Sequence, residues 1–91
     1  MAKEQRTVRF TGTVQGVGFR FTACRVAAGF DITGYVRNCP DGSVECVAEG
    51  GRCEIDAFLV ELEDRMRSYI RGRTQQTAPC SGQFRGFGTR Y

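Results

Sequence analysis

Apolar and polar residues alternate in the first patterned stretch of the chain, residues 7–14. The apolar set is Val8, Phe10, Gly12 and Val14, and the polar set is Thr7, Arg9, Thr11 and Thr13. A period of two predicts a strand with one buried face. From about residue 19 to residue 28 the apolar side chains recur at helical spacing, and Gly29 follows where a C-cap glycine would stand. Residues 15–20 therefore connect a predicted strand to the start of a predicted helix.

Two further stretches, residues 32–38 and 43–49, are predicted strands on either side of a turn. The intervening residues 39–42 read Cys-Pro-Asp-Gly. Proline presets the φ angle of a turn, and glycine accepts a positive φ. We therefore expect these two strands to form a β-hairpin.

The clearest helical pattern follows Gly50 and Gly51. Its apolar stripe, which we assign to the core, comprises Ile55, Phe58, Leu59, Leu62, Met66, Tyr69 and Ile70. Residues 71–77 are polar and poor in aliphatic side chains, which predicts an edge strand. Residues 79–82 are expected to turn the chain, and residues 84–91 to form a last short strand.

This order of elements, β-α-β-β-α-β with a short terminal strand, predicts an α+β fold of the ferredoxin-like, split βαβ type. We expect an antiparallel sheet with both helices on one of its faces. At 91 residues the chain is short for more than one domain, so residues 1–91 are predicted to form a single domain and a monomer.

The amino-acid composition limits which partners, metal sites and cellular compartments we expect. The formal net charge of +3 is too small to indicate duplex nucleic acid, and every basic residue except Lys3 is arginine, whose fork matches carboxylate and phosphate. Five cysteines without C-x-x-C spacing and without any histidine indicate neither a metal site nor a disulfide framework. We expect reduced thiols, with Cys39 the most exposed. The first residues carry no apolar run, so we expect a cytoplasmic protein with no cofactor and no membrane partner.

The loop at residues 15–20 is suited to an anion. Amides at a helix N-terminus lack partners within the helix, and glycine lets them turn toward one point. Arg20 falls in the first helical turn, where its guanidinium could close on the same anion. The residues alone leave a second interpretation open, in which the glycines serve only a tight connection. Asn38 is equally open, since it could simply begin the turn at residues 39–42.

Residues 12–20, Gly-Thr-Val-Gln-Gly-Val-Gly-Phe-Arg, resemble the signature loop of the acylphosphatase family. Residues 34–45 resemble the family's second motif, and residues 82–87 are similar to its ending. The resemblance implies hydrolysis of small-molecule acyl phosphates to carboxylate and inorganic phosphate without a metal. It implies that Asn38 positions the attacking water, while the phosphoryl oxygens accept its proton. The phosphate-binding residues that it implies are Gln15, Gly16, Val17, Gly18, Phe19 and Arg20, with Arg20 also catalytic.

Two alternatives keep the fold and change the function. Residues 85–88, Arg-Gly-Phe-Gly, copy the beginning of the RNP1 signature of single-stranded RNA-binding domains, but Thr89 and Arg90 break the pattern. We therefore expect no nucleic acid partner. The other alternative is a module that binds a small anion without turning it over, because this fold hosts many functions.

Overall fold

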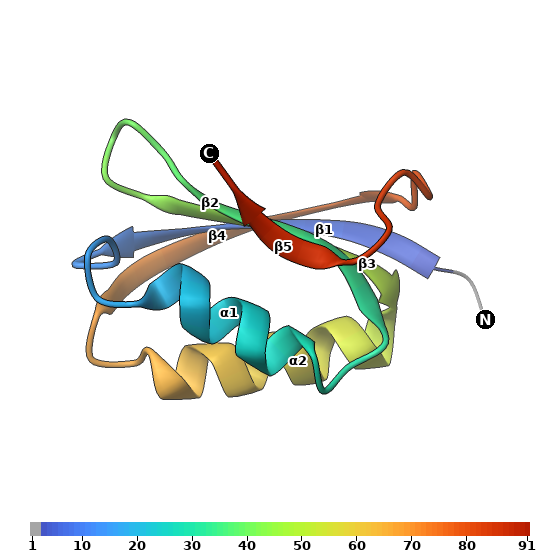
Figure 1. Ribbon diagram of the computed structural model, residues 1–91, viewed down its shortest axis with the longest axis horizontal. Helices are drawn as coiled ribbons and strands as arrows, with labels where there is room; N and C mark the ends of the chain where they lie inside the picture. The colour runs from blue at the N-terminus through green and yellow to red at the C-terminus, as the bar shows by residue number, and fades with distance from the viewer. Residues whose placement is uncertain (1–2) are drawn as a thin grey trace.

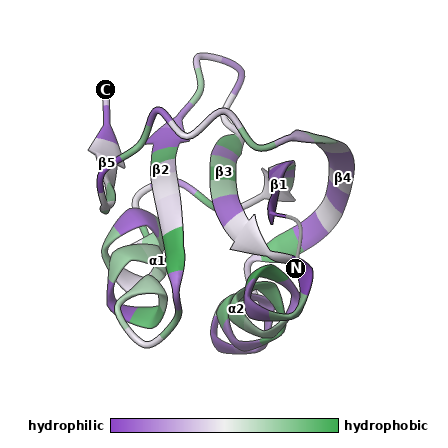
Figure 2. Cartoon of the chain, turned by 90° about the vertical axis from the view of Figure 1, so that its right-hand side faces the viewer, coloured by the Kyte–Doolittle hydropathy of each residue, from purple (hydrophilic) through white to green (hydrophobic). Residues whose placement is uncertain are grey.

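Five strands form one sheet in the computed structural model, which describes residues 3–91. The elements in chain order are β1 (Lys3–Gly12), α1 (Phe19–Ala27), β2 (Ile32–Asn38), β3 (Val44–Gly51), α2 (Arg52–Arg65), β4 (Ile70–Pro79) and β5 (Phe87–Arg90). The strand order across the sheet is β4-β1-β3-β2-β5. Both helices lie on the same face of the sheet (Figures 1 and 2). The α+β, split βαβ fold is thus confirmed.

The sheet is antiparallel, as expected, except where β5 pairs with β2. β1 pairs antiparallel with β3 and β4, and β2 pairs antiparallel with β3. β5 pairs with β2 in parallel, from Gly34↔Phe87 to Arg37↔Arg90, so the complete sheet is mixed. This parallel strand brings the C-terminal residues to the edge of the sheet where β2 ends.

The core lies between the sheet and the two helices. The expected alternation places Val8 and Phe10 of β1 against the helices, and both side chains are fully buried. Phe10 also contacts Phe19 of α1, with ring centroids 5.1 Å apart. Each such fully buried side chain contributes about 1.5–3 kcal/mol relative to exposure. The first residue of α1 is therefore fixed by the core, which orients the residues next to it.

β1 ends earlier than the apolar alternation predicts. Gly12 has a φ of 124°, and the register with β4 shifts between Thr11 and Gly12. A Cβ at Gly12 would lie 2.4 Å from the Tyr69 carbonyl oxygen, so glycine is needed here for close approach. Val14 is buried although it lies beyond the strand.

Three other expectations from the sequence are wrong in detail. α2 ends at Arg65, so Tyr69 is partly exposed and Ile70 begins β4, because the chain reverses over residues 66–69. Cys39 is buried rather than exposed: the residue is only 5% accessible, and its backbone is hydrogen-bonded to Gly42 and Ser43 within the turn. The last strand is shorter than residues 84–91 and covers only Phe87–Arg90.

Glu49 of β3 fixes the connection between β4 and β5. Its buried carboxylate accepts hydrogen bonds from the Ser81 amide at 2.8 Å, the Ser81 hydroxyl at 2.7 Å, the Gly82 amide at 3.0 Å and Gln5 Nε2 at 2.7 Å. Burial alone would raise the pKa of Glu49, but these hydrogen bonds outweigh it and lower the pKa to about 2. The ionised carboxylate thus stabilises the segment that leads into β5.

Glu49→Gln is expected to lower the free energy of unfolding at neutral pH by about 3 kcal/mol. The folded pKa of about 2 lies below the ordinary value of 4.5, so the stabilisation is complete above pH 4.5 and is lost as the pH falls toward 2. Urea unfolding at several pH values measures it. Glu61→Gln, which removes only an exposed ion pair with Arg65, is the control and costs ~0.5 kcal/mol or less. An unchanged acid sensitivity in Glu49→Gln would contradict this account.

Candidate active site

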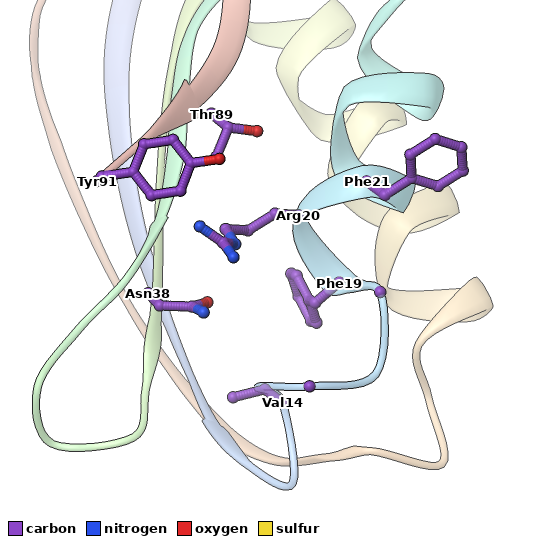
Figure 3. Close-up of a pocket in the computed structure, with 9 residues that line it drawn as sticks. Val14, Phe19, Arg20, Phe21, Asn38, Thr89 and Tyr91 are labelled. Atoms are coloured by element: carbon purple, nitrogen blue, oxygen red, sulfur yellow. The ribbon is translucent and has the colours of Figure 1, made fainter.

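A pocket of about 310 Å³ opens where the loop after β1, the first turn of α1 and the ends of β2 and β5 meet (Figure 3). Its lining residues are Val14, Gly16, Gly18, Phe19, Arg20, Phe21, Asn38, Thr89 and Tyr91. No aspartate or glutamate is among them. The pocket thus combines glycine backbone, a guanidinium, a carboxamide and hydroxyl groups.

The glycine loop adopts the left-handed conformation that the anion interpretation requires. Gly16 has a φ of 76° and Gly18 a φ of 78°, and a Cβ at either position would meet no atom. A side chain there would therefore cost conformational energy, about 1–2 kcal/mol per residue, rather than a clash. Gly18 is the N-cap of α1 and no side chain caps the helix. The first amides of α1 are left available to a ligand.

Arg20 lies in the first turn of α1, and its guanidinium reaches into the pocket (Figure 3). It stacks on the Tyr91 ring at 5.1 Å from the centroid. None of the ion pairs within residues 3–91 includes Arg20. A cation at a helix N-terminus faces the positive end of the helix dipole, which is unfavourable in the absence of an anion. The arrangement therefore gathers positive potential at one point.

Asn38 is the last residue of β2 and pairs with Val44 at the base of the hairpin. Its carboxamide points into the same pocket as the Arg20 guanidinium (Figure 3). The nearby carboxylates are engaged elsewhere: Asp41 accepts bonds from the Ser43 hydroxyl and amide, which lower its pKa. Asn38 is thus a neutral donor and acceptor beside a cationic site.

Glu45, on the opposite face of the hairpin, is also unavailable. Burial alone would raise its pKa, but hydrogen bonds from Arg37 at 2.7 Å and Tyr35 at 3.1 Å outweigh it and the pKa is lowered. A carboxylate that is ionised and already accepts two hydrogen bonds is a poor proton acceptor. The site therefore has no general base of its own among the described residues that line it.

The residues expected to bind phosphate divide into two groups. Gly16, Gly18, Phe19 and Arg20 line the pocket together with Asn38. Gln15 and Val17 do not line it: the Gln15 side chain bonds to the hairpin turn, and Val17 packs against the core.

Sequence reasoning missed Thr89 and Tyr91, which β5 delivers to the pocket. The parallel register of β5 on β2 brings them there, and no local pattern encodes that register. The resemblance at residues 82–87 marked the approach of this segment but not its endpoint. A guanidinium over an exposed aromatic ring contributes ~0.5–1 kcal/mol, so Tyr91 helps to orient Arg20.

Phe87, the aromatic residue of the RNP1-like pattern, belongs to the core side of the sheet. It is half-buried, packs against the hydrophobic core, and its ring centroid lies 5.4 Å from that of Phe58 in α2. An RNA base would need this ring on the open face. The pattern at residues 85–88 is therefore explained by packing.

Residues 3–91 lack a metal-binding cluster and a membrane-spanning helix. No group of three or more histidine, cysteine or carboxylate side chains comes together there as a metal-binding cluster. No helix in this part of the chain is long and apolar enough to cross a membrane.

The fold and the pocket together define a class: a ferredoxin-like fold with a pocket between its first strand-to-helix loop and the ends of β2 and β5. Comparison with known proteins specifies it further. A sequence model described as acylphosphatase matches residues 6–89. An acylphosphatase of Syntrophotalea carbinolica is 40% identical over 85 residues, 92% of each chain. One of Paenarthrobacter aurescens is 40% identical over 82 residues, 89% of this chain and 87% of its own.

A solved structure points to the same family as the sequence comparisons. The crystal structure of acylphosphatase from Bacillus subtilis has a TM-score of 0.87 at 25% identity, covering 97% of this chain and 99% of its own. The chain therefore belongs to the acylphosphatase family. It is an enzyme of that family, and the resemblance seen in the sequence is confirmed.

Proposed function

We propose that the enzyme hydrolyses acyl phosphates without a metal ion, with the phosphoryl group bound by Arg20 and the amides of residues 15–20 and the water positioned by Asn38. Water attacks phosphorus, the bond between phosphorus and the carboxyl oxygen breaks, and the carboxylate leaves. The products are a carboxylate and inorganic phosphate. The proton of the water passes to a phosphoryl oxygen of the substrate.

The observation that carries the proposal is the placement of Arg20. The helix offers its uncapped, positive end to the same pocket that the guanidinium enters, and no acidic residue stands in its first turn. For stability alone this is an unfavourable place for a cation. A bound dianion would satisfy the amides and the guanidinium together, with charge-assisted hydrogen bonds.

The chemistry of the pocket fits an acyl phosphate. Phosphoryl transfer passes through a loose transition state and needs mainly positioning and charge stabilisation. A carboxylate is a good leaving group, so the attacking water needs little help from a base. Asn38 can accept a hydrogen bond from that water and direct it at phosphorus. A module that only binds an anion would have no use for this carboxamide.

The proposal also covers the domain organisation, the oligomeric state and the cellular compartment of the enzyme. Residues 1–91 act as one domain and as a monomer in the cytoplasm. All five cysteines are free thiols, which suits a reducing compartment. The hydrophobic core is one cluster drawn from the helix-facing side of the sheet and from both helices.

Release of inorganic phosphate from acetyl phosphate or benzoyl phosphate, measured in excess EDTA, tests the proposal. We expect turnover that EDTA does not change and that added phosphate inhibits competitively. Loss of turnover in EDTA with recovery on adding a divalent cation would contradict metal independence. Absence of turnover in either condition, with the fold intact by circular dichroism, would contradict the function itself.

A further inference from the structure

The Gln15 side chain connects the two halves of the pocket. Its Nε2 donates to the backbone carbonyl oxygens of Cys39 at 2.8 Å and Ser43 at 2.9 Å. Both partners are pure acceptors, so the nitrogen of the amide must face them. One end of this connection is the glycine loop that leads to Arg20, and the other is the turn that follows Asn38.

The hairpin turn is folded by its own bonds, independently of Gln15. The Cys39 amide donates to the Ser43 carbonyl at 2.8 Å, and the Gly42 amide donates to the Cys39 carbonyl at 3.1 Å. Asp41 accepts bonds from the Ser43 amide and hydroxyl. These bonds set the shape of the turn, but none of them sets its distance from the glycine loop. Within residues 3–91, Gln15 supplies the side-chain hydrogen bonds between this loop and the turn.

We infer that Gln15 is a positioning residue: its amide fixes the Asn38 carboxamide relative to the loop that holds the phosphoryl group. Asn38 directly precedes Cys39, so movement of the Cys39 carbonyl would carry the carboxamide with it. Reacting atoms must lie about 3–3.5 Å apart and aligned, and a displacement of about 1 Å can cost 10²-fold in rate. This inference rests on the proposed function, because it concerns the aim of the attacking water. It gives the Gln15 side chain a role of its own, in addition to the role proposed for the Gln15 backbone amide.

Gln15→Met tests the inference because methionine has a similar length and cannot donate a hydrogen bond. Each of the two carbonyl oxygens keeps its backbone donor, so the turn should remain folded. We expect kcat to fall about 10-fold to 100-fold while the competitive inhibition constant of phosphate changes by about twofold or less. A structural role alone would not separate these two quantities.

Gln5→Met is the matched control. Gln5 also donates from Nε2, to the Glu49 carboxylate at 2.7 Å, but neither Gln5 nor Glu49 lines the pocket. The same chemical change there should lower stability and leave kcat unchanged. If both variants lose kcat in proportion to their loss of stability, the inference is wrong.

A double variant identifies the route of the effect. In an Asn38→Ala background, Gln15→Met should lower kcat no further, because the carboxamide that Gln15 aims is already missing. Full multiplication of the two single effects would overturn the inference. If the parent is active and Asn38→Ala is impaired while Gln15→Met keeps the parent kcat, the inference fails alone; if the parent shows no turnover, the proposed function fails with it.

A measurement on the unaltered protein covers the case in which Gln15→Met does not fold. NMR scalar couplings across hydrogen bonds should join the Gln15 side-chain nitrogen to the carbonyl carbons of Cys39 and Ser43, with and without inorganic phosphate. Their absence in both states would overturn the inference.

Discussion

Arg20→Ala is expected to lower kcat/KM by about 10³-fold or more, because the guanidinium supplies charge that stabilises the transferring phosphoryl group. Binding of inorganic phosphate should be lost with it. The stability of the ligand-free protein should change little, since removing a cation from the positive end of α1 offsets the loss of its contact with the Tyr91 ring. Initial rates of phosphate release and thermal unfolding with and without phosphate measure all three. In the parent, phosphate at 100 times its Kd should add about 2.7 kcal/mol of stability.

Arg25→Ala, in the last turn of the same helix, is the control for this result. Arg25 lies outside the pocket and its guanidinium stacks on Phe21 at 5.6 Å. At the C-terminal end of α1 a cation is favourable by about 0.3–1 kcal/mol, so this variant should lose stability and keep activity. Arg20→Lys keeps the charge but not the bidentate fork and should recover only part of the activity. Full activity in Arg20→Ala would contradict the proposed role.

Asn38→Ala is expected to lower kcat by about 10²-fold or more while phosphate binding is retained, because the carboxamide acts on the water rather than on the anion. The measurement is kcat for an acyl phosphate together with the inhibition constant of phosphate. Asn38→Asp is the informative comparison: its negative charge beside Arg20 should weaken phosphate binding as well as turnover. Equal losses of kcat and phosphate affinity in Asn38→Ala would place the residue in anion binding instead.

The sequence predicted the fold well where local pattern and tertiary packing agree. The strand that the alternation predicts at residues 7–14 coincides with β1 over residues 7–12, and the start of α1 at Phe19 is confirmed. The end of α2 was not predicted correctly. Tyr69 and Ile70 continue the helical spacing, but Ile70 pairs with Gly12 in the sheet. Such a pairing depends on a partner far along the chain, which a local period does not encode.

The sequence predicted the loop of the candidate site, but not the contacts that other segments make with that loop and with the pocket. Glycine followed by a helix start and an arginine indicates an anion site from local physics, and the resemblance added Asn38. The contribution of Tyr91 depends on the parallel register of β5. The double hydrogen bond of Gln15 depends on how closely the loop approaches the hairpin turn. Both are consequences of tertiary packing between segments that are distant in sequence.

The central claim is that loop amides, a guanidinium and a carboxamide face one oxyanion position. A titration of the ¹⁵N-labelled protein with inorganic phosphate in EDTA tests it most directly. The account predicts that the backbone amides of residues 16–20, Arg20 Nε and the Asn38 side-chain amide shift together along one binding curve, with a Kd equal to the inhibition constant. Phosphate-dependent shifts confined to other parts of the sheet, with these groups unmoved, would contradict it.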